Sequence, residues 1–280
     1  MFNKALTLPA DSLILDLEDA VTPDIKTEAR AQVCDWLKES DFGKQEVLVR
    51  INPLDSPWGI DDIDALLQCA PDGIVVPKVK NLKDVEAIDR LLIALEMDLG
   101  MEQGAMPLLI IGTEEASAIF NLHTTLSHER INGVAWAAED LSASLGARAR
   151  RDGAGNYLEV FSVVRSLCLL AAVASKVQPI DGPFVDIHDS EGLLRECKLT
   201  ADMGYTGKLT IHPSQIEIVN QAFMPSADEI EQAEALLVAF EENQAAGRMA
   251  FSYNGEMVDV PHLKRAEGIL RRAHSLKEEL

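Results

Sequence analysis

The sequence has no hydrophobic run long enough to cross a membrane and no basic excess that would favour nucleic acid. No apolar stretch reaches the roughly 18 residues of a membrane span, and the first residues lack a signal-peptide pattern. The 46 acidic residues outnumber the 25 basic ones, and the formal charge of −21 repels nucleic acid and anionic lipid. We therefore expect neither a membrane nor a nucleic acid among the partners of this protein.

Cysteine is scarce, and its spacing excludes the usual thiol motifs. The four cysteines are Cys34, Cys69, Cys168 and Cys197, and no two of them form a Cys-x-x-Cys pair. At least three fall in helix-like stretches among apolar neighbours, so we expect buried free thiols in a reducing cytoplasm. The sequence also contains no P-loop, nucleophile elbow or His-rich zinc pattern. These absences leave the acidic and basic residues as the candidates for a catalytic site.

Short apolar runs alternate with helix-like sequence along most of the chain. The runs predict strands at residues 12–17, 46–51, 73–76, 107–111, 132–137, 178–181 and 207–211. Between them apolar residues recur at helical spacing, as at Ile25, Ala29, Val33 and Trp36. Strands that alternate with helices imply an α/β fold with a parallel sheet, and 280 residues fit one (β/α)8 TIM barrel with a small appendage.

The predicted strands number seven, whereas a closed TIM barrel has eight. The few residues before the first strand look like the end of a helix, so we expect that a first strand and most of its helix are missing from this sequence. After residue 223 the alternation stops, and a helix near Ser226, a hairpin around Asn254-Gly255 and a final helix follow. We predict a catalytic barrel at residues 1–223 and an extension at 224–280, which packs on its own barrel or on a neighbouring subunit.

Charged residues follow most of the predicted strands, where a parallel barrel has its mouth. Glu114 and Asp140 follow two consecutive strands, and two such carboxylates can bind Mg²⁺ and leave positions for a chelating substrate. The alternative is that they cap helices. Glu115 and Glu139 compete for the same role, but strand alternation points one member of each pair away from the centre.

Arg50 ends another apolar strand, where an arginine can hold a carboxylate or stabilise an oxyanion. An ion pair with Asp16 or Glu18 is the alternative interpretation. The run Asp16-Leu17-Glu18-Asp19 supplies three acids, of which one could steady Arg50 and another could contact a substrate. Some of them are expected to be structural, because helix N-termini favour acids.

Two other polar residues at strand ends have a structural interpretation. His212 could be a general base, but it could also cap the helix that begins at Pro213. Lys78 could form a Schiff base, but nothing near it in the sequence would lower its pKa. A capping histidine and a solvated or ion-paired lysine are therefore the favoured interpretations.

A series of ordered motifs covers nearly the whole chain. They are Asp16-Leu17-Glu18-Asp19-Ala20-Val21, Val49-Arg50-Ile51-Asn52, Val76-Pro77-Lys78-Val79, Thr113-Glu114, Trp136-Ala137-Ala138-Glu139-Asp140-Leu141, Gly204-Tyr205-Thr206-Gly207-Lys208, Ile211-His212-Pro213-Ser214-Gln215 and Val258-Asp259-Val260-Pro261-His262. Together they resemble the citrate lyase beta-subunit-like proteins, which belong to the HpcH/HpaI-type aldolases. Each motif alone is weak, but their order makes the resemblance specific.

The resemblance implies a TIM barrel, usually a trimer, that uses Mg²⁺ to make or break a C–C bond between a 2-oxo acid and an acyl-CoA. It implies that Glu114 and Asp140 are the metal ligands and that Arg50 stabilises the thioester enolate. It further implies that Glu18 is an acid near the substrate and that Asp259 reaches a neighbouring subunit's site. Ala137 and Glu115 depart from the family pattern, which often has glycine and threonine there.

We therefore expect a cytoplasmic, homotrimeric lyase that cleaves citramalyl-CoA or malyl-CoA to a 2-oxo acid and acetyl-CoA. The alternatives are a citrate lyase subunit that acts on a citryl group on acyl carrier protein, and a non-catalytic metabolite-binding barrel. Thioesterase and synthase activity also remain open, because they differ from lyase activity in water placement and not in the metal motif. Arg148, Arg150 and Arg151 could meet CoA phosphates, but an exposed basic loop is the favoured interpretation.

Overall fold

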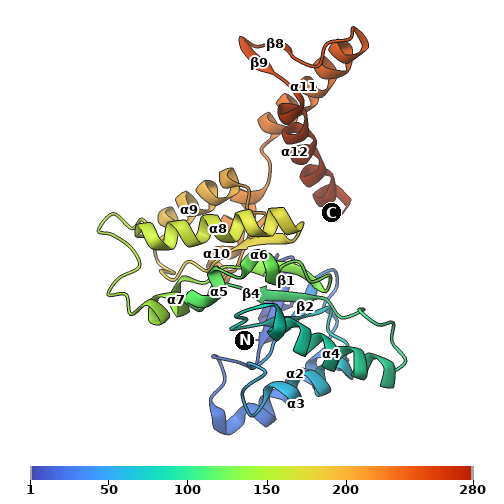
Figure 1. The fold of residues 1–280 in the computed structure, drawn as a ribbon, viewed down its shortest axis with the longest axis vertical. Coiled ribbons are helices and arrows are strands. Elements are labelled where there is room, and N and C mark those ends of the chain that lie inside the picture. Colours follow the sequence, from blue (N-terminus) through green and yellow to red (C-terminus); the bar gives the residue numbers. More distant parts are fainter. Residues whose placement is uncertain (1, 279–280) are drawn as a thin grey trace. The chain divides into compact units, whose positions relative to one another are not determined.

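Seven parallel strands form one continuous sheet in the order of the sequence (Figure 1). In this computed structural model, which describes residues 2–278 and side chains as far as residue 274, they are β1 Ser12–Asp16, β2 Glu46–Arg50, β3 Gly73–Val76, β4 Leu108–Ile111, β5 Ile131–Ala135, β6 Gln178–Asp181 and β7 Gly207–Lys208. The sheet curls as in a TIM barrel, and within the described residues β1 and β7 lie at its two ends. All seven predicted strands are confirmed.

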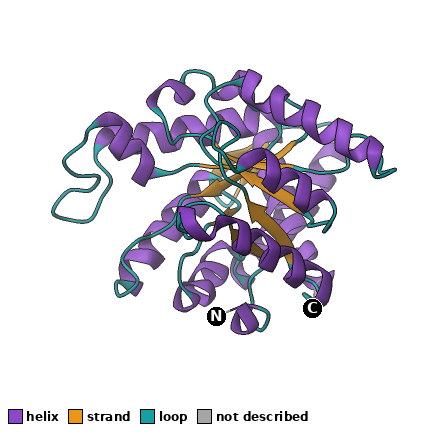
Figure 2. Ribbon diagram, turned by 90° about the horizontal axis from the view of Figure 1, so that it is seen from below, coloured by secondary structure: helices purple, strands orange, loops and turns teal. Residues whose placement is uncertain are grey.

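Helices surround these strands (Figure 2). They are α1 Phe2–Ala5, the short 3-10 helix η1 Pro23–Ile25, α2 Lys26–Glu39, α3 Gly59–Leu67, α4 Leu82–Asp98, α5 Ala116–Ile119, α6 Leu122–Thr125, α7 Ala138–Leu145, α8 Glu159–Ser175, α9 Ser190–Met203 and α10 Pro213–Phe223. Local signals set their ends. Pro23 begins the helical segment that continues into α2, and Gly204 ends α9 with a φ of 115°, a left-handed conformation that glycine adopts without a steric penalty.

Alternate residues of each strand face opposite sides of the sheet. Lys208 of β7 lies 2.9 Å from Glu196 of α9, so Lys208 and its neighbour Asp181 face the surrounding helices. Ile180 precedes Asp181 and therefore faces the inside of the curl, as does Ala135, which is its partner in the register. The sheet thus buries one layer of side chains under the helices and another inside the curl.

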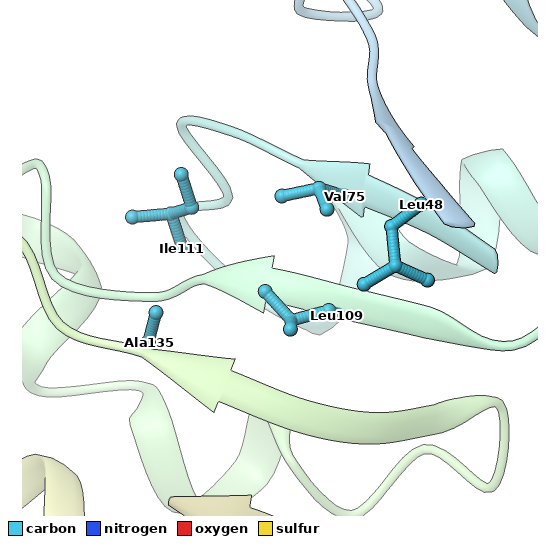
Figure 3. Packing of buried hydrophobic residues seen from close by; sticks show 5 residues of the cluster. All are labelled: Leu48, Val75, Leu109, Ile111 and Ala135. Atoms are coloured by element: carbon cyan, nitrogen blue, oxygen red, sulfur yellow. The ribbon is translucent and has the colours of Figure 1, made fainter. Parts of the chain in front are cut away.

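The inner layer is a hydrophobic cluster that lies below the charged residues. Leu48, Val75, Leu109, Ile111 and Ala135 pack together there (Figure 3). The register pairs Asp16 with Arg50 and Arg50 with Val75, which places the two charged side chains on the same inner face. The cluster therefore forms the floor beneath the carboxyl ends of the strands.

All four cysteines are buried and free. Cys34, Cys168 and Cys197 lie in α2, α8 and α9, which confirms the prediction that at least three belong to helices. Burial raises the pKa of each of these three thiols to about 12, so they are protonated at neutral pH. Within the described residues, no helix combines the length and apolar character that a bilayer crossing requires.

The chain divides into two compact units, Met1–Val219 and Asn220–Leu280. The second unit contains α11 Ala227–Ala245, the hairpin strands β8 Phe251–Tyr253 and β9 Glu256–Val258, and α12 Val260–Glu278. Ser226 caps α11 in a capping box with Glu229, and Asn254 and Gly255 form the turn of the hairpin with positive φ, as the sequence predicts. The Phe240 ring packs on Phe251 at a centroid distance of 5.4 Å and joins α11 to the hairpin.

Candidate active site

Asp16 and Arg50 end adjacent strands and form a two-pronged ion pair. Arg50 Nε donates to Asp16 Oδ1 at 2.8 Å, and Arg50 Nη2 donates to Asp16 Oδ2 at 2.6 Å. Burial would lower the pKa of Arg50, but Asp16 and Glu18 outweigh this effect and raise it above its usual value. The planar guanidinium is therefore always charged and is held in one orientation.

Glu18 is a buried acid between two cations, with only 3% of its surface exposed. Its Oε1 accepts a hydrogen bond from Lys78 Nζ at 2.6 Å, and its Oε2 lies 3.1 Å from Arg50 Nη1. The second contact is an ion pair without hydrogen-bond geometry, so Oε2 has no hydrogen-bond donor among the described residues. Burial raises the pKa of Glu18, and the two cations offset part of the increase. The sequence left open whether Asp16 or Glu18 pairs with Arg50, and in the structure both do.

The loop that carries Glu18 is held by two residues that the sequence reasoning did not weigh for the site. Lys26 Nζ donates to the carbonyl oxygens of Leu17 and Glu18, both at 2.7 Å. Asn52 Nδ2 donates to the carbonyl oxygen of Leu17 at 2.9 Å. The available signal was that Asn52 follows the Arg50 strand within one motif. These bonds fix the backbone on both sides of the acid.

Lys78 joins this charged group to the next strand end. Its side chain bonds to Glu18, and its backbone N–H donates a short hydrogen bond to Glu114 Oε2. Burial would lower the pKa of Lys78, but Glu18 and Asp19 outweigh it and raise the pKa. The amine is therefore a cation rather than a free Schiff-base nucleophile, which confirms the ion-paired interpretation of Lys78.

Glu114 follows β4 and is almost fully buried, with 2% exposure. Burial is the main reason that its pKa rises to about 8, and repulsion from Asp140 and Glu18 adds to the shift. Asp140 lies in the first turn of α7 and is half-buried. Among the described residues no cation forms an ion pair with either group, and the raised pKa keeps Glu114 mostly protonated at neutral pH.

The two competing acids are engaged elsewhere. Glu115 lies 3.1 Å from Lys80, and Glu139 forms a short ion pair with Arg150. In the part of the chain that the structure describes, no group of three or more His, Cys, Asp or Glu side chains gathers as a metal centre. A divalent cation held by Glu114 and Asp140 would therefore take its other ligands from water or from a bound small molecule.

His212 caps a helix and does not join these ion pairs, and Asp259 belongs to the second compact unit. His212 is exposed, and its Nδ1 accepts a hydrogen bond from the N–H of Ser214 at 3.2 Å, so it caps α10 and the capping interpretation is confirmed. Asp259 belongs to the second unit, where its Oδ1 lies 2.7 Å from His262 Nδ1. Its role at a neighbouring subunit's site stays a prediction.

The prediction of an exposed basic loop is wrong for two of its three arginines. Arg151 lies 2.7 Å from Glu196, and its guanidinium stacks over the Tyr157 ring at 3.6 Å. Arg150 pairs with Glu139, and Arg148 is exposed. Acids of α7 and α9 pair with Arg150 and Arg151, and the ring that Arg151 stacks on lies in the same loop. Loop composition alone does not predict the contacts with the two helices.

Known proteins resemble this chain over most of its length. A family model described as HpcH/HpaI aldolase/citrate lyase matches residues 1–213. A (3S)-malyl-CoA thioesterase of Cereibacter sphaeroides is 36% identical over 274 residues, which cover 98% of this chain and 90% of that protein. An L-malyl-CoA/beta-methylmalyl-CoA lyase of the same organism is 32% identical over 292 residues, covering 99% of this chain and 91% of the relative.

Solved structures resemble it as well. The protein CitE from Mycobacterium tuberculosis, in complex with magnesium, acetoacetate and coenzyme A, is 32% identical with a TM-score of 0.77, covering 97% of this chain and 91% of that chain. A citrate lyase from Burkholderia xenovorans has a TM-score of 0.84 at 22% identity, covering 95% of this chain and 84% of that chain, and supports the fold alone.

Proposed function

Because the chain belongs to the HpcH/HpaI aldolase/citrate lyase family of carbon–carbon lyases, we propose that it cleaves malyl-CoA or citramalyl-CoA to a 2-oxo acid and acetyl-CoA with the help of Mg²⁺. The single observation that carries the proposal is the set of side chains that end β2 or follow β4 and β5 at one edge of the sheet. Buried Glu114 beside Asp140 offers a site for a cation, and Arg50 offers a fixed positive charge on the same edge of the sheet.

The residues present fit Mg²⁺. Glu114 and Asp140 offer the hard oxygen ligands that Mg²⁺ prefers, and one or two carboxylates are its usual share of protein ligands. Asp140 and Glu18 repel the ionised form of Glu114, and a bound divalent cation would relieve this repulsion. When bound, Mg²⁺ would hold the 2-oxo acid part of the substrate through its oxygens and polarise them.

The chain's own residues account for the remaining steps. In cleavage a carboxylate takes the proton of the substrate hydroxyl, the C–C bond breaks, and its electron pair moves into the thioester as an enolate. Arg50 supplies the positive charge that stabilises this enolate, and Asp16 keeps the guanidinium in place. Protonation of the enolate carbon then yields acetyl-CoA. We assign this last acid/base role to Asp259 of a neighbouring subunit.

Hydrolysis of the thioester is a second candidate function, because a (3S)-malyl-CoA thioesterase is 36% identical to this chain. In that reaction water attacks the thioester carbonyl, and malate and free CoA are the products. Arg50 would then stabilise the charge on the carbonyl oxygen. The products therefore separate the two functions.

The first test follows the products from malyl-CoA and citramalyl-CoA with Mg²⁺ and with EDTA. We expect acetyl-CoA and a 2-oxo acid with Mg²⁺, and no turnover with EDTA. Glu114→Gln keeps the size of the side chain but loses a charged ligand, and it should lower kcat/KM by roughly 100-fold or more.

The matched control is Glu115→Gln, which removes the adjacent, partly exposed acid that pairs with Lys80. We expect its activity to stay within about threefold of wild type, as for a surface ion pair. Malate and free CoA without acetyl-CoA would favour the thioesterase, and full activity of Glu114→Gln would contradict the metal assignment.

Mg²⁺ affinity should depend on pH through Glu114. In the metal-free protein the pKa of Glu114 is about 8, above the ordinary 4.5, so Mg²⁺ must displace a proton at neutral pH. Below this pKa the affinity should fall by up to about tenfold per pH unit, and above it the affinity should level off. Calorimetry in buffers of different ionisation enthalpy measures both the affinity and the proton release.

The same shift has a consequence for stability. Between the unfolded value of 4.5 and the folded value of about 8, the folded protein keeps a proton that the unfolded chain has lost. Metal-free protein should therefore lose stability as the pH rises through this window, and Glu114→Gln should remove the trend. For the affinity prediction above, a Mg²⁺ affinity that stays constant as the pH rises from 4.5 to about 8 would contradict the assignment of Glu114 as a metal ligand.

We further propose that the protein is a cytoplasmic homotrimer and that residues 224–280 of one subunit pack on the next. An outward row on α8 supports self-association, because Val160, Val163, Leu167, Leu170 and Val173 are each between 42% and 65% exposed. Residues 160–175 contain one charged residue, Arg165, which is buried. In a chain with a net charge of −21, such a face lets copies meet with little repulsion. Sedimentation measures the mass of the assembly in solution and so tests whether it is a trimer.

A further inference from the structure

Lys78 has a backbone conformation that lysine rarely adopts. Its φ is 55°, and the other described non-glycine residues with positive φ are Ala70, Lys176 and Asn254. Those three have local reasons: Lys176 caps α8, Asn254 lies in the hairpin turn, and the Ala70 N–H closes the end of α3 through Leu66. Lys78 is separated from β3 by Pro77 and has neither a helix end nor a hairpin turn beside it. Tertiary contacts must therefore hold it in this conformation.

The contacts that hold Lys78 come from two directions. Its backbone N–H donates to Glu114 Oε2, and its Nζ donates to Glu18 Oε1 at 2.6 Å. Glu18 is 60 residues away in the sequence and Glu114 is 36 residues away. A glycine would adopt this φ without a penalty and keep the bond to Glu114, but it would lack the ammonium group. The lysine therefore supplies something that the backbone alone does not.

The ammonium group of Lys78 orients the carboxylate of Glu18. Lys78 occupies Glu18 Oε1, which leaves the unbonded Oε2 on the side of Arg50, 3.1 Å from Nη1. Glu18 is nearly fully buried, so water cannot replace a lost cation at little cost. Without the ammonium group this carboxylate could rotate, or it could draw Arg50 away from Asp16.

We infer that Lys78 is a positioning residue that links the two halves of the proposed active site. Its backbone orients the carboxylate that would hold the metal, and its side chain orients the Glu18–Arg50 pair that would stabilise the enolate. It acts through these groups and touches no reacting atom. The inference rests on the proposed function, because the two halves matter together only when one substrate spans them.

The test compares Lys78→Gly and Lys78→Met with the matched control Lys80→Met. Lys80 lies two residues further on and pairs with the partly exposed Glu115. Both Lys78 variants should lower kcat by about 100-fold, as expected when a catalytic group is misplaced, while KM changes by less than about threefold. Lys80→Met should behave like wild type.

Two further readouts separate positioning from loss of structure. Lys78→Gly retains the N–H that bonds to Glu114, so its Mg²⁺ affinity in calorimetry should match wild type. A single cooperative thermal transition should show that it remains folded, at a lower melting temperature because the buried Glu18 has lost one of its two cations. Added methylammonium should restore part of its kcat in a saturable way, because it can occupy the space that the side chain leaves. The amine should have no effect on wild type or on Lys80→Met.

A Lys78→Met enzyme with kcat within about threefold of wild type would overturn the inference, as would a folded Lys78→Gly that methylammonium does not rescue. An inactive wild type would instead overturn the proposed function. In that case Mg²⁺-dependent binding of pyruvate decides the role of Lys78. Weaker binding by Lys78→Gly that the amine restores would support positioning, and unchanged binding would exclude it.

Discussion

Replacing Arg50 with methionine is expected to lower kcat by about 100- to 1,000-fold, the usual effect of losing a donor to a developing oxyanion. Two acids hold Arg50 in place: Asp16 accepts two hydrogen bonds from its guanidinium, and Glu18 Oε2 lies 3.1 Å from Nη1. Methionine has similar length and no charge. The enolate would then form beside two carboxylates that repel it.

Arg50→Lys should recover little of this loss. A lysine ammonium cannot make the two parallel bonds to Asp16, so its charge would lie elsewhere. Asp16→Asn keeps the guanidinium and weakens only its support, and it should therefore cost less than either Arg50 variant. Steady-state assays with melting temperatures separate lost catalysis from lost folding. A folded Arg50→Met enzyme within tenfold of wild type would remove Arg50 from the mechanism.

Replacing Lys208 with methionine is expected to destabilise the fold by about 3–5 kcal/mol, as when one member of a buried ion pair is removed. The Lys208 side chain has no exposed surface. Its Nζ lies 2.5 Å from Asp181 and 2.9 Å from Glu196, and both acids are buried under the helices. Removing the ammonium leaves Asp181 with the N–H of Trp136 alone and Glu196 with Arg151 alone. Urea unfolding measures the loss.

The control for this change is Lys198→Met, which alters an exposed lysine of α9 and should shift stability by less than about 0.5 kcal/mol. Burial would lower the pKa of Lys208, but Asp181 and Glu196 outweigh it and raise the pKa above 10.5. The charge of Lys208 therefore contributes fully to the stability of the folded protein below pH 10.5. This contribution is lost only as the pH rises through the folded pKa of Lys208. A loss below 1 kcal/mol would show that the network relaxes or admits water.

The strands, many helix ends and the location of the charges could be predicted from the sequence because they depend on neighbours in the chain. Apolar runs that alternate with helical spacing define β1 to β7. Gly204 and Ser226 mark helix boundaries through local caps. Parallel strands all end on one side, so Arg50 and Glu114 had to lie at the same edge of the sheet.

The tertiary structure decided which of these charges pair with one another. Strand register brings Asp16 to Arg50, and a loop held by Lys26 and Asn52 brings Glu18 to the same guanidinium. The bond between Lys78 and Glu18 spans 60 residues of sequence. Composition and spacing mark a residue as available for an ion pair, but its partner depends on how distant segments pack. The sequence therefore identified the residues at the mouth, and only the fold showed that Lys78 connects the carboxylates to Arg50.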